Sequence, residues 1–237
     1  MSCFATPHSD WPGETFRTRY PLPVRQRAVA EASPAVMLWR AEKLRKLNPE
    51  AANTLLEVSL EKHPFAPNRY DTMLLLADIA QDKAIAGPTQ ENWTAALEKY
   101  DSVIERFGLR AEDGAPFLAK GKILIELGRE QEALNVLNNI LRNPEWRGAP
   151  QAKAHLLLGI AYHKMERYGE AHGFFERLML GFGGFHEQVA LAFYWDLKTL
   201  EAMNESESVN QLLTELRKRE DLMETEGYRL IQENYAL

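Results

Sequence analysis

The chain has 237 residues, of which 45% are hydrophobic and 26% charged, and its formal net charge is −6. An acidic chain lacks the basic surface with which proteins hold nucleic acid, so no nucleic-acid partner is expected. No apolar run approaches the ~20 residues that a membrane-spanning helix needs, so no membrane span is predicted. The single cysteine, Cys3, cannot form a disulfide within the chain.

Residues 1–33 are predicted to form a proline-punctuated N-terminal arm that is not a signal peptide, because it has no hydrophobic central stretch. Two interpretations remain open: a disordered leader, or an ordered strap whose Trp11, Phe16 and Tyr20 pack on the first helices. The location in the cell is not predicted directly. The default is cytoplasmic, or exported if the chain is a piece of a longer precursor.

Residues 34–219 are predicted to form five pairs of helices. Ser33-Pro34 and Asn48-Pro49 each give a capping side chain followed by proline, which is typical of a helix start. The later helices are expected at 67–85 and 91–107, 115–127 and 130–142, 150–165 and 168–180, and 186–203 and 205–219. A capping helix is expected within residues 220–237, at 221–235, and its apolar stripe would contain Leu222, Met223, Leu230, Ile231 and Tyr235. No segment alternates with period two over a strand's length, so the fold class is all-α.

A small residue recurs along these helices at a nearly constant interval. Ala52, Ala96, Ala133, Ala171 and Val209 are separated by 44, 37, 38 and 38 residues. The first interval becomes 37 if the polar segment GPTQEN, residues 87–92, carries about seven inserted residues. A fixed period of this length indicates a stacked helical array, since one unit alone cannot bury its apolar face.

Two glycines occupy the same position in neighbouring repeats. Gly121 and Gly159 each precede the recurring alanine by 12 residues. Glycine within a helix costs about 1 kcal/mol relative to alanine, so this repetition indicates a steric requirement. We predict that two antiparallel helices cross closely here, with Leu137 and Phe175 filling the space between them.

The segments LAKGKILIELGREQEALNVLNNIL and LLLGIAYHKMERYGEAHGFFERLM resemble tetratricopeptide repeats (TPRs). The resemblance is strongest over residues 115–180 and looser elsewhere, and the period of 37–38 is similar to that of long-period bacterial members. It implies an α–α superhelix that binds peptides or proteins, and it implies no chemistry.

The same resemblance implies a concave groove lined by the first helix of each pair. Leucines would give it an apolar floor at Leu38, Leu74, Leu118 and Leu156, which argues against the carboxylate clamp of chaperone-adaptor members. The residues expected to contact a partner are Leu74, Asp78, Leu118, Lys122, Ile125, Lys153, Leu156, Ile160, His163, Lys164, Tyr194 and Lys198.

No catalytic, metal or cofactor site is expected. The segment GFGGF at 181–185 lacks the strand and the Lys-Ser/Thr of a phosphate-binding loop, and His155, His163 and His172 lack zinc-ligand spacing. We therefore predict a non-enzymatic scaffold that binds a protein or peptide. The alternative is a structural or oligomerisation module, whose groove holds its own arm, a neighbouring domain or a second copy, as in a homo-oligomer.

Overall fold

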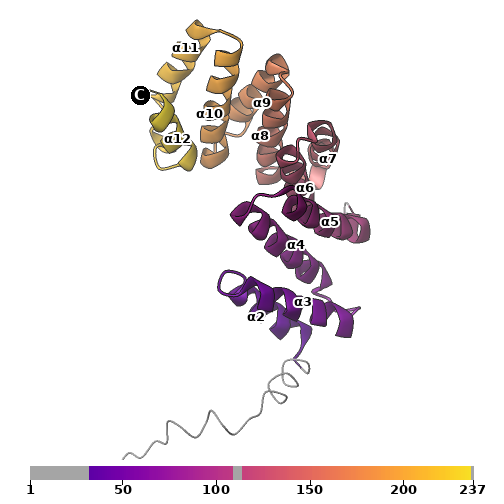
Figure 1. Ribbon diagram of the computed structural model, residues 1–237. Coiled ribbons are helices and arrows are strands. Elements are labelled where there is room, and N and C mark those ends of the chain that lie inside the picture. The colour runs from indigo at the N-terminus through magenta and orange to yellow at the C-terminus, as the bar shows by residue number, and fades with distance from the viewer. Residues whose placement is uncertain (1–31, 109–113, 236–237) are drawn as a thin grey trace, which may run out of the picture. The chain divides into compact units, whose positions relative to one another are not determined.

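The computed structural model describes residues 32–108 and 114–235, and within those ranges it has eleven α-helices and no strand. The helices are α2 (Pro34–Leu44), α3 (Pro49–Lys62), α4 (Arg69–Ala86), α5 (Gln90–Phe107), α6 (Ala115–Glu126), α7 (Glu130–Arg142), α8 (Ala149–Lys164), α9 (Tyr168–Gly181), α10 (His186–Ala202), α11 (Ser206–Leu216) and α12 (Glu226–Asn234) (Figure 1). The all-α prediction is confirmed. The arm, up to residue 31, and Cys3 lie outside the described residues.

The chain divides into two compact units, Met1–Thr72 and Met73–Leu237. In the first unit, α2 and α3 form a hairpin around buried Met37 and Leu56. Both predicted helix starts are confirmed: the Ser33 hydroxyl accepts a hydrogen bond from the Val36 amide, and the Asn48 side chain accepts one from the Ala51 amide. These contacts satisfy amides that the first helical turn leaves without a partner.

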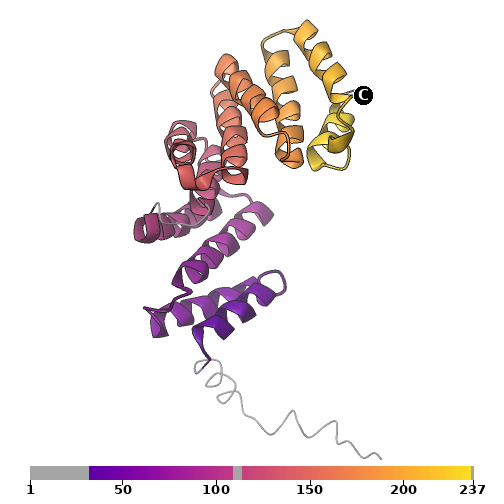
Figure 2. The ribbon, with the colours of Figure 1, turned by 180° about the vertical axis from the view of Figure 1, so that it is seen from behind.

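The second unit stacks successive helix hairpins. Within hairpins, α6 pairs with α7 and α8 pairs with α9. Between hairpins, α7 packs on α8 and α9 packs on α10. The first helices α6, α8 and α10 lie next to one another (Figure 2). Equivalent turns close the hairpins, because Gly128, Glu166 and Asn204 all adopt positive φ just after a helix. In each turn the next amide bonds back to the carbonyl five residues earlier, for example Arg129 N to Leu124 O at 2.8 Å. This is the hydrogen bond of a Schellman motif.

Gly121 and Gly159 make the predicted close approach. A Cβ atom on Gly121 would lie 2.5 Å from Leu137 Cδ2, and one on Gly159 would lie 2.7 Å from Phe175 Cζ. Leu137 and Phe175 have no exposed surface. The glycines therefore provide recesses that receive these two side chains.

The predicted insertion in the second pair is not in its loop. Ala77 on α4 takes the repeat position of Gly121 on α6, and α4 extends nine residues beyond it whereas α6 extends only five beyond Gly121. Likewise, α5 has six residues before Ala96, whereas α7 has three before Ala133. The seven extra residues thus add about one turn to each helix. The connecting segment, residues 87–89, is as short as residues 127–129 in the next hairpin.

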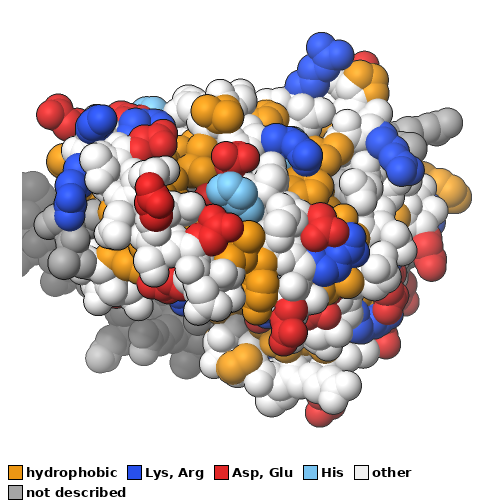
Figure 3. All heavy atoms as spheres, turned by 90° about the horizontal axis from the view of Figure 1, so that it is seen from above, with side chains coloured by type: hydrophobic (Ala, Val, Ile, Leu, Met, Phe, Trp, Pro, Cys, Tyr) orange, Lys and Arg blue, Asp and Glu red, His pale blue; other side chains and the backbone are white. Residues whose placement is uncertain are grey.

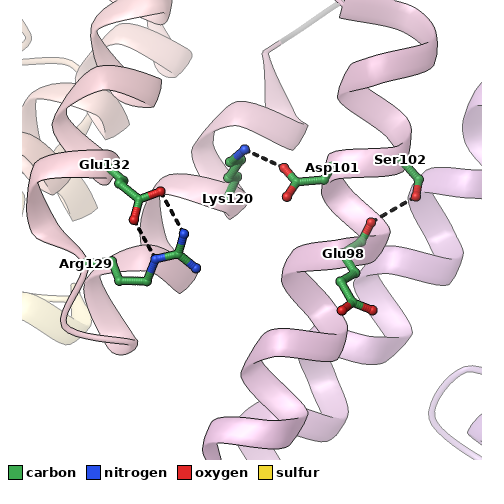
Figure 4. Close-up of polar contacts among 6 residues, drawn as sticks. All are labelled: Glu98, Asp101, Ser102, Lys120, Arg129 and Glu132. Atoms are coloured by element: carbon green, nitrogen blue, oxygen red, sulfur yellow. Dashed lines mark hydrogen bonds and ion pairs between the residues drawn. The ribbon is translucent and has the colours of Figure 1, made fainter.

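Figure 4 shows two ion pairs that involve residues of the third hairpin, α6 and α7. The Lys120 ammonium on α6 pairs with the Asp101 carboxylate on α5. Arg129 donates two hydrogen bonds of 2.7 Å to Glu132 at the start of α7. The Arg129–Glu132 pair is largely exposed, so it contributes little to stability.

The predicted C-terminal helix at 221–235 is wrong in its extent. Residues 220–222 form a 3₁₀ turn (η3), and α12 starts only after Thr225, whose hydroxyl accepts from the Tyr228 amide. The Glu187 carboxylate on α10 accepts from the Glu226 and Gly227 amides. Gly227 lies directly on the α10 backbone: a Cβ atom at this position would be 2.5 Å from the Leu191 amide nitrogen. The expected stripe is also partly wrong, because Met223 is 46% exposed.

Buried Asp196 on α10 connects that helix to α9. Its Oδ1 lies 2.8 Å from His172 Nδ1, while its buried Oδ2 has no hydrogen-bond partner among the described residues. The hydrogen bond that His172 donates to the Asp196 carboxylate raises the pKa of His172, and burial raises the pKa of Asp196. A charged imidazole is therefore favoured in the folded state.

We expect Gly159→Val to lower the free energy of unfolding by about 1–3 kcal/mol, because the added carbons must displace buried Phe175. Gly173→Ala is the matched control. It is also a glycine within a helix, but its Cβ would meet no atom within 4 Å, so the change should stabilise by up to about 1 kcal/mol. Urea denaturation measures both, and equal midpoints for the two variants would contradict the close approach.

Folding stability should depend on the protonation of His172. Since its folded pKa is raised, the stabilisation is complete below its ordinary value of 6.5 and is lost as pH rises through the folded pKa. His172→Asn should remove this fall. His155→Phe should instead remove a fall in stability at low pH. Burial lowers the pKa of His155, so the contribution of its neutral ring to folding stability is lost as pH falls below 6.5. Melting temperatures between pH 5 and 9 test the pair, and parallel curves for both variants would refute the assignment.

Candidate functional site

A hollow of about 340 Å³ lies in the second unit, lined by the first helices of successive hairpins. α4, α6 and α8 supply most of its wall, and α5 and α10 supply one residue each. The lining residues are Asp78, Gln81, Tyr100, Ala115, Leu118, Ala119, Lys122, Lys153, Leu156, Leu157 and Gln188. We call this hollow the groove pocket.

Five of the twelve residues expected to contact a partner line the groove pocket. They are Asp78, Leu118, Lys122, Lys153 and Leu156. Leu74 is partly buried on α4 outside it, and Ile125 is only 3% exposed. Leu38 belongs to the other unit and is partly buried there.

The apolar floor of the pocket follows from equivalent positions on neighbouring helices. Leu118 and Leu156 each precede the recess glycine of their helix by three residues, and Ala119 and Leu157 follow them directly. Side chains at such equivalent positions lie side by side because α6 and α8 lie next to each other. Small Ala115 and Ala119 on α6 leave space opposite the leucines of α8.

Positive charge lies at the edge of this floor. Lys122 on α6 and Lys153 on α8 are exposed, and neither makes an ion pair with a carboxylate in the described part of the chain. The negative charge in the pocket is Asp78, whose Oδ1 accepts a 2.7 Å hydrogen bond from Tyr100 Oη. An acidic group entering the pocket would therefore meet two ammonium groups and a carboxylate already bonded to the protein.

Sequence reasoning missed Tyr100 as a pocket residue. It occupies the position that Leu137 and Phe175 hold in later repeats, and it is 1% exposed. Its hydroxyl also lies 2.8 Å from Gln81 Oε1. One hydroxyl proton serves one acceptor, so the Gln81 amide must turn its NH₂ toward Tyr100 when Asp78 takes that proton. A hydroxyl at an otherwise apolar repeat position was the available signal.

The remaining expected contact residues lie further along α8 and α10. Ile160 packs against the α8–α9–α10 core. His163 Nδ1 lies 2.9 Å from Thr199 Oγ1, and Lys164 Nζ donates to the Ile125 carbonyl at 3.4 Å. Lys198 Nζ lies 4.5 Å from the centre of the Tyr194 ring. These side chains are together on two adjacent first helices, but they do not line the groove pocket.

The other candidate motifs have structural surroundings. His155 packs between Phe182 and Phe174, with ring centres 5.2 and 5.7 Å away. Gly181 ends α9, and Phe182 and Phe185 belong to the core beside it. In residues 32–108 and 114–235, no three His, Cys, Asp or Glu side chains lie close enough to hold a metal ion. No helix in the same ranges is long and apolar enough to cross a membrane.

The surface seen in Figure 3 mixes both signs of charge. Lysine and arginine side chains alternate with aspartate and glutamate, and hydrophobic side chains are exposed between them. No single sign covers that face.

No protein-family profile matches the chain, and no curated protein matches it either. Several solved structures do match. A tetratricopeptide repeat protein from Parabacteroides merdae is 21% identical, with a TM-score of 0.59 over 84% of this chain and 72% of that one. YrrB, a TPR protein with an unusual peptide-binding site, is 19% identical, with a TM-score of 0.57 over 83% and 94%. The chain has a TPR fold.

MamA from Desulfovibrio magneticus is also similar in structure, with 15% identity and a TM-score of 0.61 over 81% of this chain and 97% of that one. The TPR resemblance of residues 115–180 is thereby supported at the level of the fold. A TPR fold is an array of helix hairpins whose first helices share one face. The groove pocket lies on that face.

We expect Tyr100→Phe to lower the free energy of unfolding by about 1–2 kcal/mol, because Asp78 and Gln81 lose a buried hydrogen-bond partner. Tyr228→Phe is the matched control, since Tyr228 is also buried and no hydrogen bond to its hydroxyl is found in the described residues. It should leave stability nearly unchanged. Chemical denaturation distinguishes the two, and equal effects would show that the Tyr100 hydroxyl contributes nothing specific.

Proposed function

We propose that the groove pocket binds an extended segment of a partner protein, and that this segment places an acidic side chain between Lys122 and Lys153. The observation that carries the proposal is the combination of an apolar floor, Leu118, Leu156 and Leu157, with two exposed lysines that make no ion pair within the described residues. The protein would then act as a non-catalytic scaffold, and its ligand would combine acidic and aliphatic residues.

Three features support a peptide as the ligand class. The hollow is an open depression across several helices, which suits a chain segment. Its polar groups, Gln81 and Gln188, carry amides that match the donors and acceptors of a peptide backbone. YrrB, with the same fold, has a peptide-binding site.

Exposed ion pairs contribute little affinity individually, so the two lysines should act mainly on association rate and orientation. The apolar floor would supply most of the binding free energy, since burial of aliphatic surface is the larger favourable contribution. This division predicts a strong dependence of the association rate on ionic strength and a weaker dependence of the dissociation rate.

The test uses a random library of 16-residue peptides selected on the full chain. Peptides rich in acidic and aliphatic residues should be enriched, and Lys122→Glu/Lys153→Glu should slow their association about tenfold at low salt and much less near 0.5 M salt. The matched control is Lys62→Glu/Lys218→Glu, which changes the net charge equally at two exposed lysines outside the pocket.

Selected peptides whose association is equally fast on both double variants would refute the groove pocket as the site. Light scattering on the same preparations provides an independent outcome. A stable dimer that dissociates in the Lys122→Glu/Lys153→Glu variant, but not in the control, would show that a second copy of the chain occupies the groove. The function of the groove would then be self-association rather than the binding of a separate partner.

A further inference from the structure

A cluster of aromatic and basic side chains lies on the same first helices, beyond the groove pocket. Lys198 Nζ on α10 is 4.5 Å from the centre of the Tyr194 ring and 5.5 Å from that of Trp195. The two rings stand nearly perpendicular, with centres 5.9 Å apart. An ammonium held on aromatic faces is fixed in position but keeps its hydrogen-bond donors for another group.

His163 on α8 supports this arrangement without adding charge. The Thr199 hydroxyl donates to the Trp195 carbonyl at 2.8 Å, so it accepts from His163 Nδ1, 2.9 Å away. The His163 ring also meets the Trp195 ring edge-on at 5.4 Å. Burial, together with the nearby charge of Lys198, lowers the pKa of His163 and favours the neutral ring. His163 thereby fixes the position of Trp195.

Lys198 makes no ion pair with a carboxylate in the part of the chain that the structure describes. The acidic residue one turn along α10, Glu201, accepts a 2.9 Å hydrogen bond from Tyr235 Oη on the segment after α12. Lys164, one residue after His163, is exposed and donates to the Ile125 carbonyl. Glu201 is thus already engaged by Tyr235.

We propose that Lys198, held by Tyr194 and Trp195, forms a second subsite that binds another acidic side chain of the same extended peptide. This inference rests on the proposed function of the groove pocket. Ile160 lies on α8 between the two subsites and is partly buried, so it can contact an apolar side chain of the ligand between the two acidic ones.

The spacing of the two acidic residues follows from α8. Lys153 lines the groove pocket, and His163, which lies beside Lys198, is ten residues later on the same helix. Ten residues correspond to about 15 Å at about 1.5 Å per residue. An extended peptide advances about 3.3 Å per residue, and its side chains share a face only at even separations. Two acids four residues apart, with an apolar residue midway, satisfy both conditions.

The probes are displayed peptide libraries with two fixed glutamates and a fixed leucine on otherwise random backgrounds, with the glutamates separated by two to eight residues. Selection on the full chain should favour the separation of four, in the order Glu-x-Leu-x-Glu. Lys198→Met should weaken the selected peptides about tenfold, the loss of one charge-assisted contact, whereas Lys198→Arg should stay within about twofold. Lys218→Met is the control at an exposed lysine in the turn after α11.

The outcomes separate the two proposals. Peptides that depend on Lys122 and Lys153 but show no preferred separation and no response to Lys198→Met would overturn the second subsite and leave the groove pocket intact. Peptides insensitive to all three lysines would overturn both. Equal weakening by Lys198→Met and Lys198→Arg would show that packing on the rings, rather than charge, is responsible, and would also overturn the anionic subsite.

Discussion

The recesses at Gly121 and Gly159 set the geometry on which the second unit depends. Leu137 and Phe175 enter them, and this contact fixes how closely the two helices of each hairpin cross. Once each hairpin has that width, the second helix of one can pack on the first helix of the next, and first helices become neighbours. The shared face of α6, α8 and α10 is a consequence of this repetition. The groove pocket lies on this face, where Leu118 and Leu156 recur at equivalent positions.

Much of this organisation could be predicted from the sequence because a repeat shows each constraint more than once. The recess glycines and the hairpin turns recur in register, so their roles are visible without coordinates. The seven extra residues of the second hairpin were assigned to the wrong place. They continue a helical pattern on both sides of the turn, and a periodic sequence does not indicate where an added turn was inserted. The C-terminal helix was misjudged because Thr225 starts a helix that the apolar pattern alone would begin earlier.

The candidate site was less predictable than the fold. Positions inherited from the TPR register identified Leu118, Lys122, Lys153 and Leu156, since those depend only on helix phase. The hydrogen bond from Tyr100 to Asp78 and the contact of His163 with Thr199 join residues that are 22 and 36 positions apart. The first pair depends on how α4 and α5 meet within one hairpin and the second on how neighbouring hairpins meet, and the helical period specifies neither. For that reason the charge of Asp78 could be seen in the sequence, but its partner could not.

The attachment of α12 has a consequence for how the array can grow or shrink. α10 holds this helix through Glu187 at its first amides and through a backbone contact that only a glycine at position 227 allows. A duplicated hairpin placed after α11 would separate α12 from this seat, unless the new first helix also carried an acid and small residues at the equivalent positions. On α8 the counterpart of Ala190 is also an alanine, Ala152, but the counterpart of Glu187 is Ala149, so the acid that holds α12 is missing there. Repeat number is therefore coupled to the C-terminal helix, and gain or loss of a hairpin in evolution should be easier within the array than at this end.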